Sequence, residues 1–277
     1  MKCYLQTKDY SVSREEFELR HDENLDMLVT FPQPEDVEKY YESEDYISHT
    51  DAKKSLTEKA YQIVKSKNLQ HKLRIINRHA STKKSILDVG AGTGDFLNYA
   101  KRNSWQISGV EPNEKARKKA AEKGVFLNAG IGELKDRTFD VITLFHVLEH
   151  LPNLNHQIFS LNNLLNPGGV LIIAVPNFKS FDAAYYKEHW AAFDVPRHLW
   201  HFSQTSISKL FTKHSLYVNK TYPMIFDAFY VSLLSEKYKH KRQGYFAAFC
   251  IGLWSNIKAW SSGEYSSLIY VIKRTKQ

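Results

Sequence analysis

The fold of this chain is decided by the stretch Leu87-Asp88-Val89-Gly90-Ala91-Gly92-Thr93-Gly94-Asp95-Phe96-Leu97. It begins as a short apolar strand, passes through three glycines at alternate positions, and continues as a helix. Glycine lets the backbone approach a ligand without a Cβ clash, and the N-terminus of a helix offers free N–H groups. The spacing is Gly-x-Gly-x-Gly, whereas dinucleotide-binding enzymes carry Gly-x-Gly-x-x-Gly. Because a structural turn would by itself explain two of the three glycines, the neighbouring segments have to decide what the loop does.

Two carboxylates accompany this loop. Asp88 stands two residues before the first glycine, and Glu111 closes the next expected strand in Gly109-Val110-Glu111-Pro112-Asn113. A carboxylate beside the loop suits a cationic group such as an amino-acid ammonium, and it would repel a diphosphate. An acidic side chain after the second strand can accept hydrogen bonds from both hydroxyls of a ribose. A nicotinamide-dependent oxidoreductase is therefore disfavoured, and a helix-capping or surface carboxylate is the structural alternative for Glu111.

Short apolar runs alternate with helical stretches from residue 85 onward. Such runs, rich in β-branched residues and bounded by Gly, Pro or Asp, are typical of strands buried on both faces. Their alternation with helices predicts βαβ units and a mostly parallel sheet. The last strand is a candidate antiparallel partner. We expect strands at 85–89, 107–110, 139–145, 170–175, 216–218 and 267–272, helices near 95–103, 113–123 and 155–165, and one long basic helix over 52–79.

Four motifs in this region resemble those of the class I S-adenosylmethionine-dependent methyltransferases. They lie at 87–94, at 109–112, at 139–142 with 145–151, and at 166–171. The resemblance is nearest to the branch that includes ubiquinone-biosynthesis O-methyltransferases and many uncharacterised bacterial enzymes. It implies S-adenosylmethionine as cofactor and a Rossmann-like methyltransferase fold, an α/β fold whose doubly wound, mostly parallel sheet has seven strands.

The same resemblance assigns a cofactor site to short segments that follow the strands. A Tyr-rich segment at 40–46 resembles an aromatic lid over the cofactor, with ordinary packing of an N-terminal helix as the alternative. The implied residues are Asp88, Gly90, Ala91, Gly92, Gly94 and Phe96 at the glycine loop and the methionine part, Glu111, Pro112 and Asn113 at the ribose, Ile131 near the adenine, Phe145 and His146 near the sulfonium, and Tyr46 in the lid.

Candidate catalytic residues follow from the chemistry of methyl transfer. A nucleophile must approach, in line, a methyl group on positively charged sulfur, and positioning supplies much of the acceleration. An oxygen or nitrogen acceptor that must lose a proton also needs a base. His198, in Pro196-Arg197-His198-Leu199, is the preferred base and His146 is the second candidate. The alternative for Arg197 and His198 is structural, tying their loop to the core by hydrogen bonds.

A metal site is not expected from the sequence. His146-Val147-Leu148-Glu149-His150 fits the pattern His-x-x-Glu-His of inverted zinc proteases. However, the segment directly follows a buried strand, and Pro152 limits any helix there. Only two cysteines occur, which excludes a disulfide framework or a four-cysteine zinc site and favours a reducing cytoplasm.

The ends of the chain are expected to carry additions to one methyltransferase domain. Residues 1–50 are interpreted as an N-terminal extension with degenerate ribbon-like strands and the lid, and 51–277 as the domain itself, with an insertion at 222–265. The insertion holds an apolar aromatic run at 245–260 after a basic stretch at 237–242. The run is too short to span a membrane. A substrate-pocket cap, a homodimer face and a peripheral membrane helix remain open, in that order.

Charge and composition bear on the partners. The formal net charge of +8 would help an acidic partner approach. The basic stretches are nevertheless interpreted as solvated helix faces, and no RNA-binding signature is present, so nucleic acid is not an expected partner. The sequence predicts a cytoplasmic methyltransferase that acts on a small-molecule acceptor by O- or N-methylation. The alternative is a non-catalytic protein with the cofactor fold that serves as an interaction module.

Overall fold

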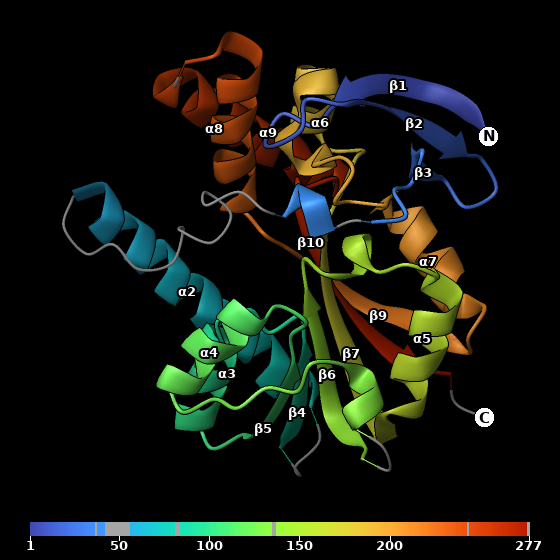
Figure 1. Ribbon diagram of the computed structural model, residues 1–277, viewed down its shortest axis with the longest axis vertical. Coiled ribbons are helices and arrows are strands. Elements are labelled where there is room, and N and C mark those ends of the chain that lie inside the picture. The colour runs from blue at the N-terminus through green and yellow to red at the C-terminus, as the bar shows by residue number, and fades with distance from the viewer. Residues whose placement is uncertain (37, 42–55, 81–83, 135–136, 243, 276–277) are drawn as a thin grey trace.

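The computed structural model describes residues 1–36, 38–41, 56–80, 84–134, 137–242 and 244–275. Its centre is a six-stranded sheet in the order β5-β4-β6-β7-β10-β9 (Figure 1). The four strands β5, β4, β6 and β7 run parallel, and β10 pairs antiparallel with both β7 and β9. These strands are β4 (Ser85–Val89), β5 (Gln106–Val110), β6 (Phe139–Phe145), β7 (Leu165–Pro176), β9 (Leu216–Pro223) and β10 (Ser267–Arg274). The predicted α/β fold with a mostly parallel sheet is confirmed, as is the antiparallel last strand.

The predicted count of seven strands is wrong for the described residues. After β5, the returning chain meets the edge of the sheet through a single parallel bridge between Val110 and Asn128. Asn128 accepts from the Glu111 N–H at 2.9 Å and donates to the Gly109 carbonyl at 3.0 Å. The Ala129 amide faces away from β5 and donates to the Glu133 carboxylate at 3.1 Å. The chain then enters the short helix η2 (Ile131–Glu133), and among the described residues the contact with β5 does not extend beyond this one bridge.

Helices cover both faces of the sheet and bury a separate apolar core on each. Successive residues of a buried strand point to opposite faces. Val141 therefore packs with residues of α2 and α3, while its neighbour Ile142 packs with residues of α5 and α7. The helices on the first face are α2 (Leu56–His79), α3 (Asp95–Arg102) and α4 (Glu114–Glu122), and those on the second are α5 (Leu154–Asn163) and α7 (Gln204–Thr212).

A second, antiparallel sheet joins the N-terminus to the loop that follows β7. Its order is β1-β2-β3-β8, with β1 (Lys2–Lys8), β2 (Glu16–Asp22), β3 (Met27–Phe31) and β8 (Trp200–His201). Thr30 donates its hydroxyl to the His198 carbonyl at 2.6 Å, and Ser203 donates to the Asp26 carbonyl at 2.7 Å. The first 31 residues are thereby fixed beside residues 196–203, which include the segment Pro196-Arg197-His198-Leu199 that carries the preferred base.

The C-terminal part adds a helical layer next to this second sheet (Figure 1). It consists of α6 (Phe181–Tyr186), the short η4 (Lys187–His189) and η5 (Ala191–Phe193), α8 (Asp227–His240) and α9 (Tyr245–Ser262). Helices α8 and α9 approach closely at Gly252, where a Cβ would lie 3.0 Å from the Phe229 Cα. The Asp182 carboxylate, which is buried, accepts from Trp190, Ser255 and Ser266 and so ties α6 to α9 and to the residue that precedes β10.

None of the helices in the described part of the chain has the length and apolar character that a membrane crossing requires. The outer face of α9 is nevertheless aromatic: Phe246 is 82% exposed and Trp260 is 74% exposed. The domain boundaries and the role of the insertion remain predictions.

Candidate functional site

The residues predicted to bind the cofactor gather at the carboxyl ends of three parallel strands. The glycine loop follows β4, Glu111 follows β5, and Phe145 is the last residue of β6. The Gly90 and Ala91 amides both donate to the Val110 carbonyl, at 2.9 and 3.0 Å, which fixes the loop against the end of β5. In open α/β sheets this edge is where ligands bind.

Gly90 occupies a position in the loop that other residues cannot adopt without strain. Its φ is +70°, and a Cβ there would lie 2.4 Å from Cγ2 of Val147. We expect Gly90→Ala to lower the free energy of unfolding by about 2 kcal/mol or more, since the left-handed backbone alone costs about 1–2 kcal/mol. Gly168→Ala is the matched control, because Gly168 has φ +77° with nothing within 4 Å of its Cβ position. Urea unfolding of both variants measures the difference, and an equal loss in the two would contradict the steric part of this prediction.

Glu111 fastens the glycine loop to the start of α4. Its Oε2 accepts from the Gly92 amide and its Oε1 from the Asn113 amide, both at 2.9 Å. Asn113 in turn caps α4 by accepting from the Ala116 amide at 3.0 Å. Each carboxylate oxygen has a second lone pair, so the partly exposed Glu111 can still accept hydrogen bonds from a ligand.

Asp88 lies almost fully buried beneath this loop, with 4% of its surface exposed. Thr143 on the neighbouring strand donates its hydroxyl to Oδ1 of Asp88 at 2.6 Å. Burial raises the pKa of Asp88 to about 7, although the Thr143 hydrogen bond and the charge of Lys72 oppose this rise. At neutral pH the carboxyl group is therefore close to half protonated.

Lys72 reaches the same region from α2. Its Nζ lies 4.0 Å from the centre of the Phe145 ring, and that ring packs edge-on against Phe96 with centroids 5.1 Å apart. Burial lowers the pKa of Lys72, while the charges of Asp88 and Asp227 act in the opposite direction. The site thus offers an acidic and a basic group at one edge of the sheet.

His146 follows β6 directly and is held between two carboxylates. Its Nε2 lies 3.1 Å from Oδ2 of Asp227 on α8, and its Nδ1 lies 3.5 Å from Oε1 of Glu149. Burial alone would lower the pKa of His146, but the two carboxylates outweigh burial and raise it to about 9. A protonated imidazole has no lone pair to accept a proton. His146 is therefore poorly suited to the role of general base at neutral pH.

Arg197 ties its loop to the N-terminal sheet. Its buried guanidinium donates to Asp194 at 2.7 and 3.0 Å, to Asp9 at 2.9 Å and to the Tyr40 carbonyl at 2.9 Å. These hydrogen bonds are the ones expected if Arg197 has a structural role and ties its loop to the core.

His198 lies beside His150 of the short helix η3 (Leu148–His150), with ring centroids 4.5 Å apart. His198 bonds through Nδ1 to the Ala192 carbonyl at 2.9 Å, and His150 bonds through Nδ1 to the Arg197 carbonyl at 2.9 Å. Burial lowers the pKa of His150 to about 4, so His150 is neutral. The Tyr41 hydroxyl lies 3.0 Å from Nδ1 of His150.

The predicted residues therefore fall into two groups. The glycine loop, Glu111, Phe145 and His146 meet at the carboxyl edge of the sheet, whereas His198 belongs to a second group with Glu149 and His150. Glu149 links the two through its ion pair with His146. Ile131 is partly buried in η2 (Ile131–Glu133), and Pro112 is exposed. Tyr46 lies outside the described residues.

Several residues of the site could not be recognised from the sequence. Thr143 contacts Asp88 because the two are paired in the register of β4 and β6. Asp227 reaches His146 from 81 positions further along the chain. The one usable signal was the pattern His-x-x-Glu-His, which marks Glu149 and His150 as residues of a type and spacing that can bind a metal ion.

Comparison with known proteins places this geometry in a family. Residues 63–220, more than half of the chain, match the family model described as a methyltransferase domain. A ubiquinone biosynthesis O-methyltransferase of Nitrosococcus oceani is 32% identical over 117 residues, which cover 38% of this chain and 50% of the relative. A protein of the same description from Actinobacillus pleuropneumoniae is 34% identical over 108 residues, covering 34% of this chain and 46% of the relative. The chain thus spans about half the length of these curated relatives.

A solved structure supports the fold over a longer stretch. The magnesium protoporphyrin IX methyltransferase of Synechocystis, with bound S-adenosylhomocysteine, superposes with a TM-score of 0.54. The match covers 86% of this chain and 92% of that protein, at 13% sequence identity. At this identity the likeness concerns the fold alone.

Proposed function

We propose that this chain, which belongs to the methyltransferase-domain family and carries an S-adenosylmethionine-dependent methyltransferase domain, methylates an oxygen atom of a small-molecule acceptor. The observation that carries the proposal is the position of Glu111. Its carboxylate is oriented by two backbone amides at the carboxyl ends of β4 and β5, and it retains free lone pairs for the two hydroxyls of a ribose.

The residues around Glu111 fit S-adenosylmethionine. Beside the loop, a Cβ on Gly92 would meet nothing within 4 Å, so the backbone there borders open space. Asp88 suits the ammonium group of the methionine part, and Lys72 suits its carboxylate. Phe145 and Phe96 supply an apolar wall next to these charges.

The chemistry asks little of the protein beyond position and proton removal. When bound, S-adenosylmethionine supplies a methyl group on positively charged sulfur. The chain has to hold the acceptor oxygen in line with that methyl group, exclude water and take the proton of a hydroxyl acceptor. His198 is the preferred base, because its Nδ1–H donates to the Ala192 carbonyl and its Nε2 then carries a lone pair.

Transfer to oxygen is favoured over transfer to nitrogen by the relatives. Both curated relatives described above are named as O-methyltransferases of ubiquinone biosynthesis. We propose a hydroxylated small molecule as the acceptor class for this chain. Incubation with S-adenosylmethionine and a panel of phenols, catechols and aliphatic alcohols tests this, with mass spectrometry of the products. Formation of N-methylated products only, from a matched panel of amines, would contradict the choice of oxygen.

The raised pKa of Asp88 leads to a pH dependence of cofactor binding. In the free protein this carboxyl group gains a proton as the pH falls through 7, whereas a bound ammonium group requires the carboxylate. We therefore expect the dissociation constant for S-adenosylmethionine to be about eightfold higher at pH 6 than at pH 7.5, following the ionised fraction of a group with a pKa of 7. Calorimetric titration at a series of pH values measures this.

Asp88→Asn is the control for this dependence. Its side chain still accepts from the Thr143 hydroxyl but no longer titrates. The variant should bind more weakly at pH 7.5 and show a flat profile between pH 6 and 7.5. An unchanged slope in Asp88→Asn would mean that another group controls the dependence.

A further inference from the structure

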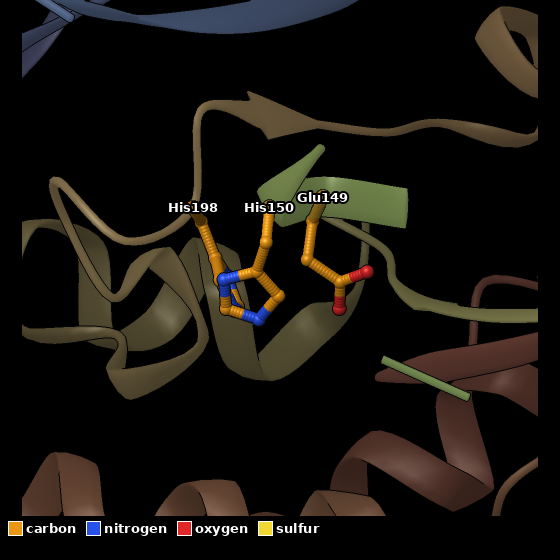
Figure 2. A group of neighbouring side chains, drawn as sticks. All are labelled: Glu149, His150 and His198. Carbon is orange, nitrogen blue, oxygen red and sulfur yellow. The ribbon is translucent and has the colours of Figure 1, made fainter. Parts of the chain in front are cut away.

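Glu149, His150 and His198 form a compact cluster outside the proposed cofactor site (Figure 2). One ligand atom from each lies within 4.8 Å of the others. Glu149 and His150 are neighbours on η3, and His198 comes from the loop before β8. Figure 2 shows the three side chains extending from the two segments toward a common region.

The carboxylate of Glu149 lacks the hydrogen bonds that burial demands. The residue is fully buried, and neither carboxylate oxygen has a hydrogen-bond partner among the described residues. Its ion pair with Nδ1 of His146 spans 3.5 Å, too long for a good hydrogen bond. Burying a charged group without hydrogen bonds lowers the stability of the folded protein. A further positive charge beside Glu149 would offset this loss of stability.

The two histidines are oriented in the way that metal-binding histidines are. Each bonds through Nδ1 to a backbone carbonyl, that of Ala192 for His198 and that of Arg197 for His150. Such a bond fixes the ring and its tautomer and leaves the lone pair on Nε2. Metal-ligating histidines almost always make this second bond to a carbonyl or carboxylate.

We propose that Glu149, His150 and His198 bind a divalent transition-metal ion of the zinc type. Two histidines and one glutamate are a ligand set of catalytic zinc sites, in which a fourth position stays open. Imidazole ligands favour zinc and its first-row neighbours over magnesium or calcium. The carbonyls of Ala192 and Arg197 form the outer shell of the site.

A metal at this place would alter one step of the proposed methyl transfer. With Nε2 of His198 bound to the ion, that nitrogen cannot accept a proton. An acceptor hydroxyl in the fourth position would instead release its proton to solvent water before methyl transfer, because the metal lowers the pKa of a bound oxygen. This step rests on the proposed function, whereas metal binding itself does not.

The test uses the full-length protein after treatment with a chelator and removal of the chelator. Zinc chloride or cobalt chloride is added, unbound metal is removed by gel filtration, and bound metal is measured by mass spectrometry. We expect one equivalent in the wild-type protein, and visible ligand-field bands in the cobalt form. Glu149→Gln and His198→Gln should each weaken binding at least about 100-fold, since even outer-shell changes cost about 10- to 100-fold.

Two control variants separate binding at this cluster from binding at histidines elsewhere on the protein. His146→Gln removes the ion-pair partner of Glu149 but no proposed ligand, and His214→Gln removes a surface histidine that contacts Asn155. Both should retain one equivalent of metal. Glu149→Gln keeps the size of the side chain, and circular dichroism of each variant shows whether it folds.

Two results would overturn the proposal: wild-type protein that binds no more metal than folded His198→Gln, or metal lost on His214→Gln and kept in Glu149→Gln. Binding of S-adenosylmethionine to the same chelator-treated protein, measured by calorimetry, keeps this test separate from the proposed function. A protein that binds the cofactor but no metal refutes only the metal site, and one that binds metal but no cofactor refutes only the methyltransferase proposal.

Discussion

Arg197→Ala is expected to lower the free energy of unfolding by about 3–5 kcal/mol, the range measured when one partner of a buried ion pair is removed. The guanidinium is 1% exposed and lies between the carboxylates of Asp9 and Asp194. Asp9 is fully buried and, within the described part of the chain, would keep only its bonds from backbone amides, among them those of Ser11 and Ser13. The substitution therefore leaves a buried negative charge without its cation.

The position of Arg197 in the fold makes the loss larger than that of one ion pair between neighbours. Asp9 follows β1, Tyr40 begins the Tyr-rich segment, and Asp194 follows η5, so a single side chain joins three distant parts of the chain. Arg197→Lys should recover only part of the stability, because an ammonium group cannot reproduce the planar set of donors.

Urea unfolding followed by circular dichroism measures these losses. Arg137→Ala serves as the matched control, because the Arg137 guanidinium donates to the Ser108 hydroxyl in an exposed bond. We expect a change within about 0.5 kcal/mol for Arg137→Ala, as is usual for surface substitutions. A loss below about 1 kcal/mol for Arg197→Ala would mean that the buried network relaxes or admits water.

Local sequence patterns predicted the parallel half of the fold well. The segment 139–145 was expected as a strand from its apolar, β-branched run, and β6 has the same bounds. Such a strand is buried on both faces, so its composition alone distinguishes it. The seventh strand, which was expected from the resemblance alone, was not found for the opposite reason. After β5 the described chain meets the sheet through the single bridge of Asn128 and then enters η2, and no local pattern announces where a contact at the sheet edge ends.

The residues of the candidate site also fall into those that local sequence patterns predict and those that they do not. Positions in the glycine loop and Glu111 could be assigned because they lie within a few residues of a strand end. The contacts of His146 with Asp227 and of Arg197 with Asp9 join residues 81 and 188 positions apart, respectively. Their charge states depend on those contacts. The second candidate base, His146, could therefore not be recognised as a charged histidine before its partners were located.

Glu111 is the position where loss of one side chain should affect cofactor binding most. We expect Glu111→Ala to raise the dissociation constant for S-adenosylmethionine at least about 100-fold. A hydrogen bond to a charged group contributes about 1.5–3 kcal/mol, and about 2.7 kcal/mol corresponds to about 100-fold. The amides of Gly92 and Asn113 also lose their acceptor, which frees the loop that the carboxylate orients.

Glu111→Gln separates the contribution of the hydrogen bonds to the ribose from that of the hydrogen bonds that orient the loop. Its amide oxygen can still accept one of the two backbone bonds or one ribose hydroxyl, so its affinity should fall between those of the wild type and Glu111→Ala. Glu114→Gln is the matched control, because Glu114 lies in the first turn of α4 and pairs with Lys118 in an exposed ion pair. Calorimetric titration with S-adenosylmethionine should show unchanged binding for this control. Wild-type affinity in Glu111→Ala would mean that the ribose is held elsewhere, and the carboxylate would then serve only to hold the glycine loop against α4.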